Sequence, residues 1–175
     1  MLTVAHTTIG AAIGSFIVDT PSGNVLALGL GVASHYILDS IPHWENWFGR
    51  EIYGFPSDTP LQKFPKITII SGLFDFIIAV TLFVFVYRNV GSGPFYQSSL
   101  FWGAFGGFLP DLLDNVPLIS NVAIRLPGVK RERAFHEQVH ISRADQTKAP
   151  YLAGLATQLI AIAFGLYLIM QWSTL

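Results

Sequence analysis

The chain has 175 residues, the size of one domain. It is 51% hydrophobic and 12% charged, with a mean hydropathy of +0.50, which lies outside the range of ordinary soluble domains. The net charge is −1, and the absence of cysteine excludes disulfides, thiolate metal sites and a cysteine nucleophile. These values predict a single integral membrane domain over residues 1–175.

The apolar residues form long blocks, which predict an all-α bundle of about five transmembrane helices. The predicted spans are residues 2–18, 24–41, 67–87, 96–113 and 151–172. The first and fourth spans are rich in glycine and other small residues, which suits close helix packing in lipid. Two polar segments, residues 42–66 and 115–150, join the spans, and the second is expected to form an amphipathic surface helix over about 130–143.

The basic residues are distributed unevenly over the two sides of this bundle. Nine of the ten lysines and arginines would lie on the side of the N-terminus and the two polar segments, and only Arg88 on the other. The positive-inside rule therefore places the N-terminus and both segments in the cytoplasm and the C-terminus outside. Trp44, Trp47, Tyr53 and Trp172 are expected to be interfacial anchors.

The stretch from His35 to His43 carries the strongest chemical signal. His35, Asp39 and His43 are spaced i, i+4 and i+8, so on a helix they share one face. Two imidazoles and a carboxylate on one face are typical ligands of a divalent transition metal. The alternative is that each histidine is a hydrogen-bonded core residue.

Further ligand-type side chains fall at the same end of the predicted bundle. Together with the three above, the candidate ligands include all five histidines of the chain: His6, His35, Asp39, His43, Asp111, Asp114, His136 and His140. This set exceeds the needs of one tetrahedral zinc, so two or three zinc ions (or manganese) sharing carboxylates are expected. Asp111 and Asp114 have a helix-capping alternative. Asp75, inside the third span, is either near the metal or bonded to a neighbouring helix.

His136-Glu137-Gln-Val-His140 matches the H-E-x-x-H pattern of zinc proteases, with Glu137 as general base. The pattern is short and lies in a charged segment, so a solvated amphipathic helix is the alternative. An intramembrane zinc protease is nevertheless a second functional hypothesis. A non-enzymatic metal transporter or metal-stabilised scaffold is the third.

Two motifs resemble known families. His35-Tyr-x-x-Asp39-x-x-Pro42-His43 resembles the metal-binding helix of zinc-dependent phospholipase C and P1-type nucleases. His6 with Ile9-Gly10, and Gly106-Gly-Phe-Leu-Pro-Asp111-x-x-Asp114, are similar to the bacterial and archaeal membrane-bound metal-dependent hydrolases. The resemblance implies a phosphodiesterase with several zinc ions in a bacterial or archaeal cytoplasmic membrane.

The first functional hypothesis is therefore a metal-dependent hydrolase that cleaves a phosphoester or phosphodiester with metal-activated water at the cytoplasmic face. The residues assigned to catalysis are Asp39, His43 and Glu137, the last two as ligand or general base. Lys130, Arg131 and Arg133 are expected to attract an anionic headgroup. The expected substrate is a phospholipid or lipid-linked molecule rather than a nucleic acid, and a homodimer through the glycine-rich spans is left open.

Overall fold

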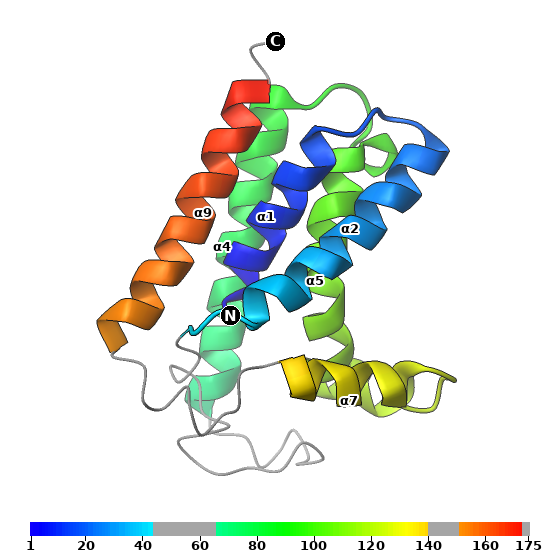
Figure 1. The fold of residues 1–175 in the computed structure, drawn as a ribbon, viewed down its shortest axis with the longest axis vertical. Helices are drawn as coiled ribbons and strands as arrows, with labels where there is room; N and C mark the ends of the chain where they lie inside the picture. Colours follow the sequence, from blue (N-terminus) through cyan, green and yellow to red (C-terminus); the bar gives the residue numbers. More distant parts are fainter. Residues whose placement is uncertain (44–65, 140–150, 173–175) are drawn as a thin grey trace.

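The computed structural model describes residues 1–43, 66–139 and 151–172, and within these ranges the chain is helical without any strand. Five long helices form the bundle in Figure 1: α1 (Thr3–Ser15), α2 (Pro21–Asp39), α4 (Lys66–Val90), α5 (Ser99–Asn115) and α9 (Tyr151–Trp172). α1, α4 and α9 run in one direction, and α2 and α5 in the other. The predicted all-α bundle is confirmed, with helix ends within a few residues of the predicted ones.

Two of these helices are long and apolar enough to cross a membrane, over Gly72–Val90 in α4 and Ala153–Gln171 in α9. Only 11% and 28% of these stretches are buried within the bundle, and large side chains such as Phe74 and Phe85 are exposed. Among the described helices, α1, α2 and α5 do not meet the same criterion, and α1 has only 13 residues. The prediction of five helices is therefore confirmed, whereas membrane-crossing length and hydropathy are found for two.

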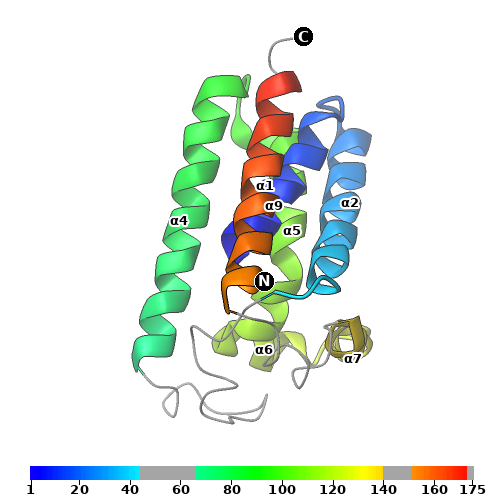
Figure 2. The ribbon, with the colours of Figure 1, turned by 60° about the vertical axis from the view of Figure 1, so that its left-hand side comes forward.

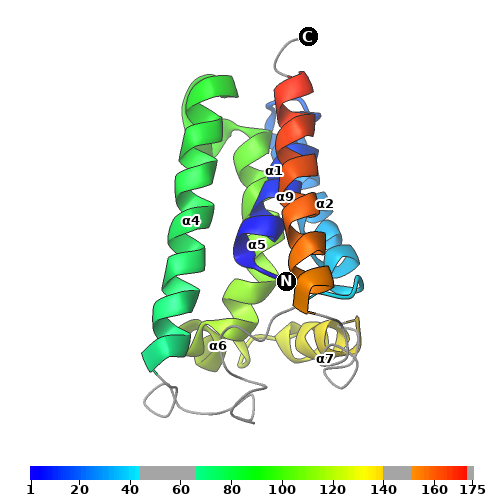
Figure 3. The same ribbon diagram turned by 90° about the vertical axis from the view of Figure 1, so that its left-hand side faces the viewer.

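α1 lies at the centre of the bundle, between α2, α4, α5 and α9 (Figure 3). Glycines allow it to approach α5 closely. A Cβ atom added to Gly10 would lie 2.2 Å from the Gly103 carbonyl oxygen, and one added to Gly107 would lie 2.3 Å from the His6 carbonyl oxygen. No side chain fits at either position, so the predicted close packing of small residues is confirmed.

The first turn of α1 is buried, and its backbone N–H groups are bonded by neighbouring helices. Asp75 on α4 accepts hydrogen bonds from the backbone nitrogens of Thr3 (2.7 Å) and Val4 (3.3 Å). Gln158 on α9 accepts one from the nitrogen of Leu2 (2.8 Å). These side chains supply the partners that a helix start lacks. Of the two roles expected for Asp75, the structure shows the bond to a neighbouring helix.

Short elements complete the fold. A 3₁₀ turn, η2 (Phe95–Gln97), precedes α5, while α6 (Pro117–Ala123) and α7 (Val129–Val139) follow it. Figures 1 and 2 show α7 lying across one end of the bundle, roughly perpendicular to the long helices. Gly128, at φ +96°, makes the turn into α7. α7 confirms that a helix forms over most of the predicted range, and its position at a membrane surface stays a prediction. Residues 140–143 of that range lie outside the described residues. The short helix α6 was not predicted.

Candidate metal centre

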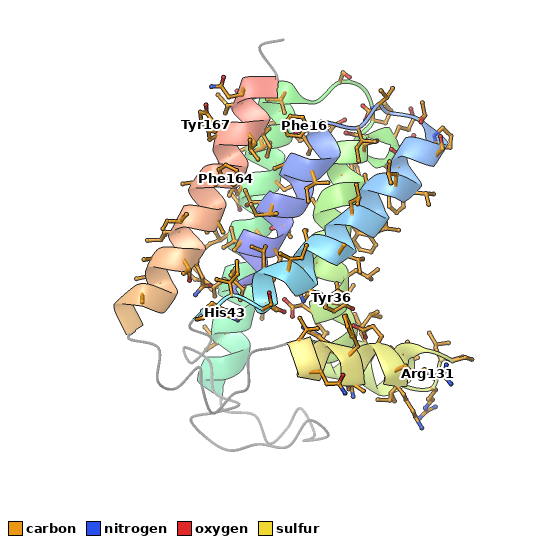
Figure 4. The ribbon with its side chains drawn as sticks, viewed as in Figure 1. Phe16, Tyr36, His43, Arg131, Phe164 and Tyr167 are labelled. Carbon is orange, nitrogen blue, oxygen red and sulfur yellow. The ribbon has the colours of Figure 1, made fainter. Side chains whose placement is uncertain are left out.

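The predicted cluster forms at the end of the bundle that α7 covers, around the carboxylate of Asp39. His35, Asp39 and His43 are fully buried. The prediction that one helix face carries all three is wrong for His43, because α2 ends at Asp39 and a short turn follows. That turn still returns His43 to the cluster, with its Nε2 atom 3.7 Å from Asp39 Oδ1. Figure 4 shows His43 and Tyr36 at this end.

Three ligand-type atoms form a compact triangle. His35 Nε2 and His136 Nε2 are 3.1 Å apart, and they lie 3.1 Å and 3.0 Å from Asp39 Oδ2. A divalent ion with bonds of about 2.0–2.1 Å holds neighbouring ligand atoms about 3.0 Å apart in octahedral and about 3.3 Å apart in tetrahedral geometry. The triangle therefore fits such an ion almost without rearrangement. These residues are one of the groups in the described part of the chain that could hold a metal.

The other ring nitrogens explain why the Nε2 atoms converge. His35 Nδ1 lies 2.8 Å from the Gly107 carbonyl oxygen, which can only accept, so Nδ1 donates the hydrogen. His136 Nδ1 lies 2.9 Å from Asp114 Oδ2. Both imidazoles are thus held at Nδ1 and can present the lone pair of Nε2, as metal-binding histidines do. Two such lone pairs and a carboxylate oxygen repel one another unless a metal ion or a proton lies between them.

The charges around His136 favour its protonated form when no ion is bound. Burial alone would lower the pKa of His136, but its hydrogen bonds to Asp114 and Asp39 outweigh burial and raise this pKa to about 10. Burial works to raise the pKa of Asp114, yet the bonds from His136 and Arg133 hold it below its ordinary value. Asp114, predicted as a ligand, therefore lies against the outer nitrogen of His136 and orients that ring.

His6 approaches the other oxygen of Asp39. Its ring stacks on His35 with centroids 3.9 Å apart, and its Nε2 atom lies 3.1 Å from Asp39 Oδ1. Apart from this contact, the two ring nitrogens of this fully buried histidine have no partner among the described residues. An unsatisfied buried imidazole is costly, and a bound ion would satisfy it.

Asp111 and His43 complete the surroundings of the cluster. Asp111 Oδ1 is 3.9 Å from His35 Nε2, and Asp111, His6 and His35 form a second group that could hold an ion. His43 Nδ1 donates to the Ile41 carbonyl oxygen at 2.7 Å, which leaves Nε2 facing Asp39. The backbone nitrogen of Met1 lies 3.0 Å from Asp39 Oδ1 and 2.6 Å from His43 Nε2.

The contacts that dock α7 were not predicted from the sequence. Tyr36 donates a hydrogen bond of 2.6 Å to Glu132 Oε1. Arg133 donates to Asp114 at 3.0 Å and to Ser120 at 2.6 Å. Two nitrogens of the Arg133 guanidinium are thus bonded within the protein, and its expected attraction of a headgroup stays a prediction. Burial raises the pKa of Glu132, whose Oε2 atom has no hydrogen-bond partner among the described residues.

Two predicted site residues cannot be placed. His140 lies outside the described residues, as does the side chain of Glu137, although Glu137 belongs to α7. The described residues bring together His6, His35, Asp39, His43, Asp111 and His136, with Asp114 behind them. Comparison with known proteins adds nothing to this picture, since no family model, curated protein or solved structure matches the chain.

Proposed function

We propose that this protein is a membrane-embedded hydrolase, dependent on zinc or manganese, that cleaves a phosphoester or phosphodiester of a lipid or lipid-linked substrate. One observation carries the proposal. His35 and His136 are each held at Nδ1 and direct Nε2 at the same carboxylate oxygen of Asp39, and these three atoms lie 3.0–3.1 Å from one another. Such an arrangement belongs to metal-binding sites rather than to an apolar core.

The residues of the centre have different proposed roles. His35, Asp39 and His136 would hold the ion, with His6 and Asp111 beside them at distances that admit a second one. When bound, such ions lower the pKa of water and neutralise charge on phosphoryl oxygens. His43 Nε2 lies 3.7 Å from Asp39 Oδ1 and 2.6 Å from the backbone nitrogen of Met1, so a role for His43 as ligand or general base requires that Met1 give way.

The membrane placement rests on α4 and α9. Their apolar stretches are long enough to cross a bilayer and remain mostly exposed on the bundle. An exposed apolar surface of this extent needs a non-aqueous surrounding. The metal centre would then lie near one membrane surface, with α7 above it. This position favours a substrate that resides in the membrane.

The contacts of His136 and Asp75 bear on the alternatives. A zinc protease built on the H-E-x-x-H pattern would leave His35 and Asp39 dispensable, whereas Nε2 of His136 is directed at both of these residues. Transport needs polar groups through the membrane, but Asp75 and Gln158 are bonded to the start of α1. Both observations favour a hydrolase centred on α2.

Elemental analysis and hydrolysis assays on protein purified in mild detergent test this proposal. We expect bound zinc or manganese and hydrolysis of bis(4-nitrophenyl) phosphate or of a phospholipid in the wild type, and loss of both in His35→Ala and Asp39→Asn. Ile37→Ala, an exposed position on the same helix, is the matched control and should retain both. A His35→Ala protein that keeps its full metal content would overturn the proposal. A Glu137→Gln protein that keeps its zinc but loses a peptide-cleaving activity of the wild type would favour the protease.

A further inference from the structure

α7 has two functionally different faces. Its inward face carries Glu132, Arg133 and His136, which contact α2 and α5. Its outward face exposes Lys130, Arg131, Ala134 and Gln138. Figure 4 shows Arg131 on α7 away from Tyr36 and His43. One short helix therefore links a metal-ligand position to an exposed basic surface.

α7 is attached to the bundle mainly through four side chains. His136 contacts Asp114, Asp39 and His35. Glu132 accepts a hydrogen bond from Tyr36, Arg133 donates to Asp114 and Ser120, and Phe135 packs edge-on against Tyr36 at 5.0 Å between centroids. α7 has 11 residues, and a helix of this length is marginal on its own in water. Its helical state and its docking therefore depend on each other, and modest additional interactions can shift both.

The orientation of α7 suggests where such an interaction originates. α4 and α9, the two helices that could cross a membrane, run along the bundle axis, and α7 lies across its end (Figures 1 and 2). If α4 and α9 span the bilayer, α7 lies parallel to the membrane surface at the depth of the headgroups. Lys130 and Arg131, side by side on the docked helix, then complement anionic headgroups.

We propose that anionic phospholipid binds Lys130 and Arg131 on docked α7 and thereby strengthens metal binding, because the same docking delivers His136 to Asp39 and His35. This rests on the proposed function, in its metal centre and membrane placement. The effect requires that the lipid favour the docked helix over the undocked segment. The docked helix binds the lipid better than the undocked segment, because it holds Lys130 and Arg131 together on its exposed face. Two basic side chains near an anionic surface correspond to about a 30-fold change in an equilibrium constant.

Zinc affinity in nanodiscs is the test, measured by competition with a chelator of known affinity. The wild type, Lys130→Gln/Arg131→Gln and Lys130→Arg/Arg131→Lys are each placed in phosphatidylglycerol and in phosphatidylcholine discs. Arg88→Gln, which removes an exposed cation from α4, is the matched control. Zinc accumulates near any anionic bilayer, so the comparison is between variants in the same disc.

In phosphatidylglycerol discs we expect the wild type, the charge-conserving variant and Arg88→Gln to bind zinc up to about 30-fold more tightly than Lys130→Gln/Arg131→Gln. In phosphatidylcholine discs all four should agree within about twofold. Equal affinities in both discs, or tighter binding by the Gln variant, would overturn this inference while leaving the metal centre intact. Absence of zinc binding in every sample would overturn the proposed function as well.

Discussion

The variant Asp114→Asn distinguishes two possible roles of Asp114, as a metal ligand or as the residue that orients His136. Asp114 Oδ2 lies 2.9 Å from His136 Nδ1, and Oδ1 lies 3.0 Å from Arg133 Nε. Both carboxylate oxygens thus have hydrogen-bond partners from α7. An asparagine can keep one accepting oxygen toward Nδ1, so the ring orientation is retained, but the negative charge that strengthens the imidazole as a ligand is lost.

We expect Asp114→Asn to weaken zinc binding 10- to 100-fold, or about 1.4–2.7 kcal/mol, without changing the number of ions per chain. Chelator competition gives the affinity and elemental analysis the stoichiometry. Asp19→Asn is the matched control, because Asp19 also accepts a hydrogen bond, from the Ser99 backbone nitrogen at 2.6 Å. This contact joins the α1–α2 connection to the start of α5, at the opposite end of the bundle. Asp19→Asn should leave both quantities unchanged.

Two results would refute this reasoning. If Asp114→Asn loses a whole ion per chain at saturating zinc, Asp114 is itself a ligand, as the group of Asp114, Glu132 and His136 permits. If the affinity is unchanged, the carboxylate has no influence on His136, and the contact at 2.9 Å contributes only to the docking of α7. Circular dichroism of both variants excludes general unfolding as the cause.

Three further perturbations test the packing and the charges around the centre. Gly10→Ala should lower stability by about 1–3 kcal/mol, because the new Cβ would meet a carbonyl of α5; Gly29→Ala, with open space around it, should be neutral or stabilising in the same thermal unfolding assay. Asp75→Asn should lower the free energy of unfolding by about 1 kcal/mol, because the cap of α1 is weakened, and should leave the zinc content unchanged. A drop in zinc content would place Asp75 in the metal site. In metal-free protein the ion pairs of His136 stabilise the fold fully below pH 6.5 and are lost as the pH rises through about 10, so the melting temperature should fall over that range. Zinc affinity should rise over the same range because fewer protons must be displaced, and a pH-independent affinity would contradict this assignment.

Hydropathy was sufficient to predict the long helices, because apolar blocks as long as those of α4 and α9 are typical of helices rather than of strands. Hydropathy overestimated the length of α1, which was predicted over residues 2–18 and has 13 helical residues. α1 is apolar because four neighbouring helices surround it. The short helix α6 was missed because seven residues carry too little periodicity to be recognised. Its start at Pro117 is the only local signal, and proline is as common in turns.

The ligand positions were predictable to a different degree. His35 and Asp39 could be paired from their spacing alone, since a helix puts i and i+4 on one face. The roles of Asp75 and Asp114 depend on partners 71 and 22 residues away, which no local pattern contains. The bond between Tyr36 and Glu132, which spans 96 residues, was not predictable for the same reason.

The residues around Asp39 come from helices that are distant in the sequence. His6 belongs to α1, Asp39 to α2 and His136 to α7. A divalent ion held by them would be a cross-link in a chain that has no cysteine to form a covalent one. At 1,000 times its dissociation constant, a ligand stabilises a fold by about 4 kcal/mol. Chelation should accordingly accelerate amide hydrogen exchange in α7 and the last turn of α2 first, while the glycine-packed part of α1 and α5 keeps its protection.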